Sequence, residues 1–129
     1  MTNDKSESLL RIVAAMVTAI AMALPVGALS FSVGNYKYYT TSDTEVTVDG
    51  FSASAPSGKN YVDFPGMVTY GGKTYYVKTV GSYAFAYNPN IEEAVIPFGV
   101  TEIEENAFDG CTSLDAVRLP GTMRRLQSD

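Results

Sequence analysis

A 23-residue internal repeat constrains the fold of this chain more than any other feature of its sequence. The stretch IEENAFDGCTSLDAVRLP at residues 103–120 follows VGSYAFAYNPNIEEAVIP at residues 80–97 at a constant offset of 23 positions. The matched positions are apolar or turn-forming, whereas the unmatched positions are mostly polar. Stacked repeats have this pattern, because each unit buries its apolar face only against the next unit. The sequence therefore predicts a short solenoid.

The repeat also predicts which side chains form the core. Val80 and Ile103 share one column of the repeat, and Phe85 and Phe108 share another. If Phe108 is a stacked core residue, its replacement by alanine should cost ~3–5 kcal/mol of stability. Pro120 ends the last apolar strand, because proline cannot donate to a strand ladder. We expect the buried set to be Val80, Phe85, Ile91, Ile96, Val100, Ile103, Phe108, Cys111, Leu114, Val117 and Leu119.

The first thirty residues are predicted to be a helical signal peptide that precedes the fold. A polar segment, residues 1–11, is followed by the uncharged run 12–24 and then by proline and small residues. This three-part plan is typical of a secretory signal, with cleavage after Ala28 or Ser30. The alternative is an uncleaved anchor, since the uncharged run extends to Val33 and a membrane span needs ~20 residues. Either reading predicts a secreted or cell-surface protein, which contacts a membrane only if this segment is retained.

Residues 31–79 are rich in Tyr, Val, Thr, Gly and Ser and predict a β-rich N-terminal cap. We expect strands at residues 35–40 and 45–49, the second half-buried and ended by Asp49-Gly50. Gly71-Gly72 lies between two Tyr- and Thr-rich runs. This pattern predicts a tight hairpin, because glycine adopts the positive φ of a two-residue turn.

The cap also contains a degenerate first repeat. Val62-Asp63-Phe64-Pro65 has the same form as Ala94-Val95-Ile96-Pro97 in the first full copy. Terminal repeats of solenoids are atypical, because they must cover the open end of the core. The predicted organisation is therefore a signal segment at 1–30, a β-rich cap with a degenerate repeat at 31–79, and two repeats with the start of a third at 80–129.

The joint spacing of Ala-Phe, Cys, Leu and Leu-Pro in the second copy resembles the BspA-type leucine-rich repeat. This family occurs in surface and secreted proteins, mainly of bacteria and some protozoa, and the resemblance covers residues 31–129. It implies a mainly β leucine-rich-repeat solenoid with an N-terminal β-hairpin cap. The column that often holds cysteine in the family holds Asn88 in the first copy and Cys111 in the second, where we expect a structural role.

The resemblance implies an exported, non-enzymatic binding or adhesion module for host proteins, other cells or matrix components. Repeat arrays bind through outward strand residues, which can vary without harm to the core. The outward positions here are predicted to be Glu93, Val95, Ala116 and Arg118. The nine tyrosines are a second candidate feature, either as binding anchors or as ordinary strand residues.

A second hypothesis is a truncated or assembly-only fragment with no ligand of its own. The printed chain holds two full repeats and four residues of a third, Leu126 to Asp129, whereas solenoids usually need at least ~3 repeats. Under this hypothesis, the open C-terminal edge of the array associates with another copy, because an uncovered solenoid end is sticky.

Composition argues against several classes of site. The formal net charge of −5 disfavours nucleic acid, which binds basic surfaces. There is no histidine, and the single cysteine, Cys111, leaves no internal disulfide and no multi-cysteine metal site. The carboxylates at 92–93 and 102–105 predict a solvated acidic face, with weak Ca²⁺ binding as the alternative. We therefore expect no enzyme, no catalytic residue, no cofactor and no metal ligand.

Overall fold

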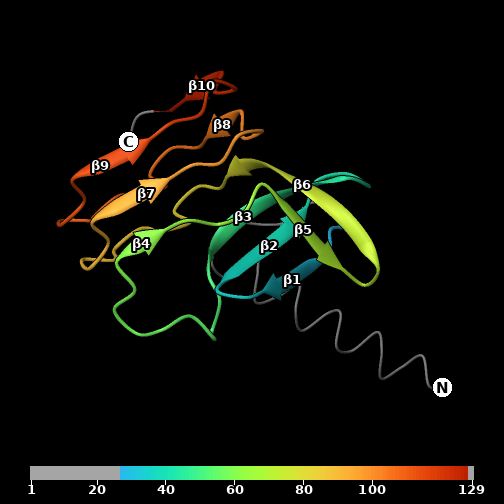
Figure 1. The fold of residues 1–129 in the computed structure, drawn as a ribbon, viewed down its shortest axis with the longest axis horizontal. Helices are drawn as coiled ribbons and strands as arrows, with labels where there is room; N and C mark the ends of the chain where they lie inside the picture. The colour runs from blue at the N-terminus through green and yellow to red at the C-terminus, as the bar shows by residue number, and fades with distance from the viewer. Residues whose placement is uncertain (1–26, 128–129) are drawn as a thin grey trace.

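Ten β-strands make up the regular structure of residues 27–127, the part of the chain that the computed structural model describes (Figure 1). Within this range no helix is long and apolar enough to cross a bilayer. The predicted signal peptide lies outside the described range except for residues 27–30. The predicted boundary after residue 30 falls inside the first strand, and the boundary after residue 79 falls inside the sixth.

The strands form two sheets. The larger sheet has the order β1-β2-β3-β6-β8-β10, and β5 pairs with β6 outside this order. The smaller sheet has the order β4-β7-β9. The larger sheet contains β1 (Ser30–Val33), β2 (Tyr36–Thr40), β3 (Glu45–Phe51), β5 (Met67–Tyr70), β6 (Lys73–Val80), β8 (Glu102–Ile103) and β10 (Arg125–Leu126). The smaller sheet contains β4 (Tyr61–Val62), β7 (Glu93–Val95) and β9 (Ala116–Arg118).

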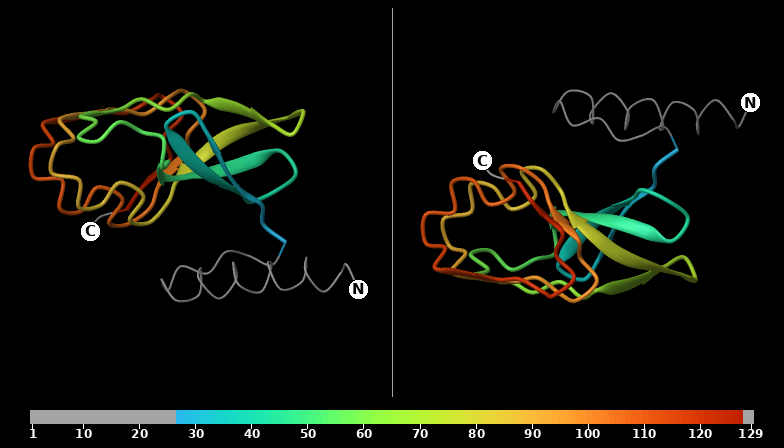
Figure 2. Two further views of the ribbon diagram at one scale, coloured as in Figure 1. Left: turned by 90° about the horizontal axis from the view of Figure 1, so that it is seen from below. Right: turned by 90° about the horizontal axis from the view of Figure 1, so that it is seen from above.

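The repeats stack as parallel layers, which confirms the predicted solenoid. In the larger sheet Val80 pairs with Ile103, and Ile103 pairs with Leu126, each one repeat apart. In the smaller sheet β4, β7 and β9 are also parallel, so the predicted degenerate repeat forms the first layer. The turns of successive repeats lie nearly one over another in Figure 2.

The cap is a curled set of strands beside the first layer of the solenoid. β1, β2 and β3 are antiparallel neighbours, and β3 then pairs in parallel with β6. The predicted hairpin is confirmed: β5 and β6 are antiparallel and joined by Gly71 and Gly72, with φ of 61° and 78°. Phe31 of β1 stacks on Tyr70 of β5, with ring centroids 4.3 Å apart, so the two ends of the cap meet.

The prediction for β3 was wrong in two respects. The strand continues through Asp49 and Gly50 to Phe51, and Val46, Thr47 and Val48 are buried consecutively instead of alternating. Both faces of β3 are covered, because the first turn of the repeats packs on the side opposite to the cap core. Gly81 of that turn donates its N–H to the Val48 carbonyl and lies against the Thr47 methyl group.

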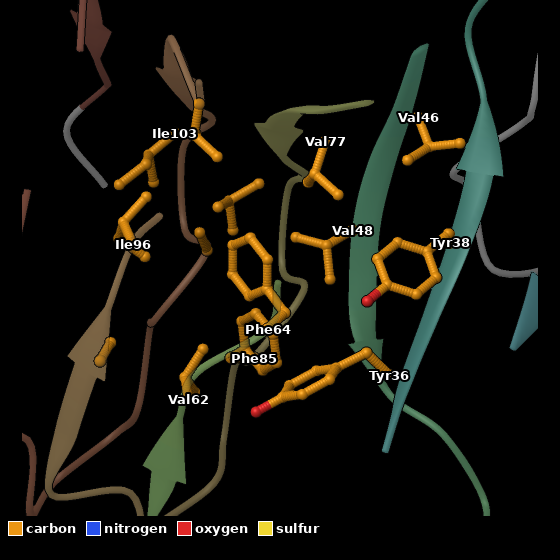
Figure 3. Packing of buried hydrophobic residues seen from close by; sticks show 14 of the residues in the cluster. Tyr36, Tyr38, Val46, Val48, Val62, Phe64, Val77, Phe85, Ile96 and Ile103 are labelled. Atoms are coloured by element: carbon orange, nitrogen blue, oxygen red, sulfur yellow. The ribbon is translucent and has the colours of Figure 1, made fainter. Parts of the chain in front are cut away.

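A single hydrophobic core runs from the cap into the repeats (Figure 3). Phe85 lies at its centre, with its ring centroid 5.1 Å from Phe51, 5.6 Å from Phe108, 6.1 Å from Tyr36 and 6.4 Å from Phe64. The Tyr36 hydroxyl donates to Asp63 Oδ1 (2.6 Å) and accepts from the Asp63 N–H (2.8 Å). Cap and solenoid therefore share aromatic contacts and hydrogen bonds.

The predicted core residues become less buried toward the last layer. Val80, Phe85, Ile91, Ile96, Val100 and Ile103 are buried, while Phe108, Cys111 and Leu114 are partly buried against the core. Val117 and Leu119 are 38% and 45% exposed, which contradicts the expectation that they are core residues. The reason is that no further layer covers them within the described residues. Strand pairing and residue spacing are repeated from copy to copy, whereas the burial of a side chain depends on whether a neighbouring layer covers it.

Candidate functional site

The outward side of the β4–β7–β9 sheet carries all four predicted binding residues. We call this surface the strand face, and its residues are Tyr61, Glu93, Val95, Ala116 and Arg118. Successive side chains of a strand point to opposite sides. Val62 and Ala94 are fully buried, so Tyr61, Glu93 and Val95 point outward. In the parallel register, Tyr61 is beside Glu93, Glu93 is beside Ala116, and Val95 is beside Arg118. Figure 1 shows the three strands side by side.

An ion pair ties two of these residues together. Arg118 Nε donates to the Glu93 carboxylate across the β7–β9 pair. The Arg118 side chain is 69% exposed, and such exposed pairs contribute at most about 1 kcal/mol of stability. A guanidinium has five N–H donors in a rigid fork. The pair therefore orients Arg118 while leaving further donors for a partner.

The sequence-based prediction omitted Tyr61 from the strand face. Tyr61 is exposed and occupies the position of Glu93 in the degenerate first layer. The sequence did contain the information needed to find Tyr61. The match of Val62 with Ala94 places Tyr61 and Glu93, the residues before them, in one column of the repeat. Interface anchors are commonly tyrosine, so Tyr61 is the aromatic member of this surface.

Comparison with known families decides what kind of solenoid presents this face. Residues 77–129 match the family described as BspA type leucine rich repeat region (6 copies). Residues 77–129 are a BspA-type leucine-rich repeat region. The match begins at Val77, in the half of β6 that enters the first full repeat. Leucine-rich repeats generally act as non-enzymatic interaction modules, with binding surfaces formed by stacked layers.

Three solved structures have the same kind of fold. A leucine-rich repeat protein from Bacteroides ovatus is 30% identical, with a TM-score of 0.63 over 72% of this chain and 24% of that protein. One from Bacteroides capillosus is 24% identical, with a TM-score of 0.65 over 76% of this chain and 87% of that protein. A leucine rich cell surface protein from Faecalibacterium prausnitzii is 30% identical, with a TM-score of 0.60 over 69% and 23%.

The chain thus spans about a quarter of the Bacteroides ovatus and Faecalibacterium prausnitzii proteins. No curated protein matches it.

The cysteine column of the BspA-type repeats is used for internal hydrogen bonding. The Cys111 thiol donates to the Phe85 carbonyl at 3.0 Å, and Asn88 Nδ2 donates to the same carbonyl at 2.8 Å. Burial raises the pKa of the Cys111 thiol, which disfavours the reactive thiolate. Both residues of this column therefore bind the Phe85 carbonyl, Asn88 from the same repeat and Cys111 from the next one.

The acidic residues of the repeats are only partly the solvated face that was predicted. Glu92 and Glu105 are exposed, but three other carboxylates bind neighbouring layers. Glu93 accepts from Arg118, Glu104 Oε1 accepts from the Ser82 N–H at 3.1 Å, and Glu102 Oε2 accepts from Gln127 at 2.9 Å. Among residues 27–127, no group of three or more His, Cys, Asp or Glu side chains is placed to hold a metal ion.

A small pocket lies beside the first repeat. It is open, has a volume of about 210 Å³, and is lined by the cap loop 51–52 and 55–59 together with Asn88 and Asn90. Sites for drug-sized ligands usually span ~300–1,000 Å³ and are mostly apolar. This pocket is smaller than that range, so the strand face remains the better candidate for recognition.

Asp49 is a partly buried carboxylate on β3, and burial raises its pKa, with a smaller lowering by Lys37. A raised carboxyl pKa contributes stability that is present below the unfolded pKa and is lost as pH rises through the folded value. Asp49→Asn is therefore expected to raise the melting temperature at pH 7 and to lose that advantage near pH 3. Thermal melts at both pH values check this, with exposed Asp43→Asn as the control. A lower melting temperature for Asp49→Asn at pH 7 would show that the attraction to Lys37 dominates.

Proposed function

We propose that this chain is an exported, non-enzymatic module that binds protein or cell-surface partners through the strand face. The observation that carries the proposal is the set of outward residues in adjacent columns on the BspA-type repeats. An aromatic side chain, an aliphatic side chain and an oriented guanidinium lie within three adjacent strands. Tyrosine and arginine are the residue types enriched at binding hot spots.

The charge of the surface narrows the kind of partner. Arg118 and Glu93 already form a pair, so an incoming carboxylate can bind the free side of the guanidinium in bidentate fashion. Tyr61 and Val95 supply the exposed apolar contacts that a partner can bury. A protein surface with an acidic group beside an apolar side chain fits this arrangement. Adhesion to cells or matrix is the biological setting that we propose for such contacts.

The size of the strand face limits its affinity. Neighbouring strands lie ~4.8 Å apart, so three short strands cover far less than the ~800 Å² that each partner gives to a standard interface. We therefore expect weak, transient binding from this face alone. Support for export comes from the N-terminal segment, and the related Faecalibacterium prausnitzii protein is described as a cell surface protein.

The test is a binding screen of the full chain against matrix proteins and receptor ectodomains immobilised on a sensor. We expect the Val95→Asp/Arg118→Glu variant to bind the partners found in this screen at least about tenfold more weakly. The first substitution puts a charge in place of a central apolar contact, and the second reverses a charge. Lys73→Glu at the hairpin tip reverses a charge away from the face and serves as the matched control. Equal loss with both variants would contradict the proposal.

A second candidate function is assembly with another copy through the last described layer. The observation that favours it is the exposure of Val117, Leu119 and Leu126 on that layer. Light scattering on the same preparation distinguishes the two functions. A dimer that Leu126→Glu converts to a monomer, together with no hit in the screen, would favour assembly.

Export makes a prediction about the mature N-terminus. The Leu29 N–H donates to Thr40 Oγ1 at 2.8 Å, and the Leu29 carbonyl accepts from the Thr40 N–H at 2.9 Å. β1 then begins at Ser30. Cleavage after Ala28 keeps these contacts, whereas cleavage after Ser30 removes them. We therefore expect Leu29 to be the first residue of the secreted protein, as measured by intact-mass spectrometry, and a first residue of Phe31 would contradict this.

A further inference from the structure

Two tyrosines outside the strand face have an unusual backbone conformation. Tyr83 and Tyr87 lie in the turn that joins β6 to β7, with φ of 58° and 61°. This left-handed region is unfavourable for bulky residues, and such outliers concentrate at functional sites. A physical reason for placing tyrosine at both positions is therefore required.

The second repeat provides an internal comparison. Asn106 occupies the column of Tyr83 with φ of 60°, and Gly110 occupies the column of Tyr87 with φ of 72°. Asparagine and glycine are the residues that tolerate this conformation best. The two turns are bonded in register, since the Phe85 N–H donates to the Ala107 carbonyl at 2.8 Å. The fold thus requires the left-handed backbone at both columns, but it does not require tyrosine.

The two rings form an exposed pair. Their centroids are 6.5 Å apart with 24° between the ring planes, and Tyr83 and Tyr87 are 46% and 67% exposed. The Tyr87 ring lies over Gly110, where an added Cβ would come within 2.6 Å of its Cδ1 atom. The Tyr87 ring therefore has one supported side, and both rings have substantial area in solvent. Rings held in this way are suited to stacking with a ligand.

Polar groups of the next turn fix the hydroxyl ends of both rings. Tyr83 Oη accepts from Asn106 Nδ2 at 3.0 Å, and Tyr87 Oη donates to Asp109 Oδ2 at 3.4 Å. Asp109 therefore places a carboxylate beside the aromatic pair, and the whole chain carries a net charge of −5. An aromatic face beside a carboxylate is complementary to a cation, because the ring face and the carboxylate are both negative.

We propose that Tyr83 and Tyr87 form a docking platform for an arginine side chain of a basic partner protein, with Asp109 as its counter-charge. Arginine fits better than lysine, because a planar guanidinium stacks on an aromatic ring and binds a carboxylate through its edge. This site is independent of the strand face, which lies on β4, β7 and β9, whereas both tyrosines lie in the turn between β6 and β7.

The test uses the full chain and a fluorescein-labelled nona-arginine peptide, followed by fluorescence anisotropy at physiological salt. We expect Tyr83→Asn/Tyr87→Asn to weaken peptide binding about tenfold, because two cation–π contacts are lost at unchanged charge. Tyr70→Asn/Tyr76→Asn removes two similarly exposed tyrosines of the cap and should leave binding unchanged. Asp109→Asn should also weaken binding.

Stability provides a second readout. The double variant should melt no lower than the wild type, because asparagine relieves the strain at both columns. If it fails to fold, Tyr87→Gly, which copies Gly110, replaces it in the binding assay. Equal binding by wild type and platform variants would overturn the proposal, and so would equal binding of a nona-citrulline peptide. Tyrosine-dependent displacement of the peptide by neutral chitohexaose would also overturn it, since the platform would then recognise a glycan.

Discussion

Phe85→Ala is expected to lower the free energy of unfolding by about 3–5 kcal/mol, the largest effect of any single truncation in the repeats. Phe85 has no exposed surface, and its ring contacts Tyr36 and Phe51 of the cap, Phe64 of the first layer and Phe108 of the next. Truncation leaves a cavity that all four rings border, so little collapse can fill it. Since domains of this size are stable by only ~5–15 kcal/mol, the variant should be close to unfolded. Urea titration followed by circular dichroism measures the change.

Phe108→Ala is the matched control for this prediction. Phe108 occupies the same column one repeat later but is only partly buried against the core. We therefore expect its truncation to cost less than the ~3–5 kcal/mol inferred from the sequence for a fully buried ring. If Phe85→Ala and Phe108→Ala lower the free energy of unfolding equally, this would contradict the conclusion that burial decreases along the column.

Gly50→Ala is expected to destabilise the chain by roughly 3 kcal/mol or more. Gly50 has φ of 126°, and a Cβ at this position would overlap the Ala84 carbonyl oxygen, which belongs to the first turn of the repeats. Backbone cannot move aside as a flexible side chain can. The substitution should therefore separate β3 from that turn and lower the melting temperature by more than 10 °C, as measured by differential scanning calorimetry.

Two other glycines separate the causes of this effect. Gly34 has φ of 60° with open space around it, so Gly34→Ala measures the backbone strain alone. Gly121 has open space and no positive φ, so Gly121→Ala should be nearly neutral. If Gly34→Ala costs as much as Gly50→Ala, the close approach of β3 and the repeat turn contributes nothing.

The sequence predicted those features that depend on the period of the repeat. The columns Val80–Ile103–Leu126 and Ala94–Val117 appear in the parallel register as expected. The hairpin at Gly71-Gly72 was also predictable, because two adjacent glycines between strand-forming runs specify a tight turn. Both predictions rest on local pattern or on period, and neither needs knowledge of how distant segments pack.

The features that the sequence did not predict depend on long-range packing. The burial of Thr47 results from a repeat turn that lies more than thirty residues later in the chain. The exposure of Val117 and Leu119 depends on which layer comes next, and this is not a property of their own columns. The left-handed conformations of Tyr83 and Tyr87 could have been inferred from Asn106 and Gly110 in the next copy, but tyrosine itself gives no such signal.

β6 belongs to the cap and to the solenoid at once. Its first half pairs with β5, its second half pairs with β3 on one side, and Thr79 and Val80 pair with β8 on the other. Neither part can separate from the other without breaking hydrogen bonds along this one strand. Cap and repeats should therefore unfold as one cooperative unit, with the amide protons of Val77 and Val80 exchanging only on global opening. Extra layers could be gained or lost at the far end of such an array during evolution, whereas the cap could not be exchanged without rewriting the first repeat.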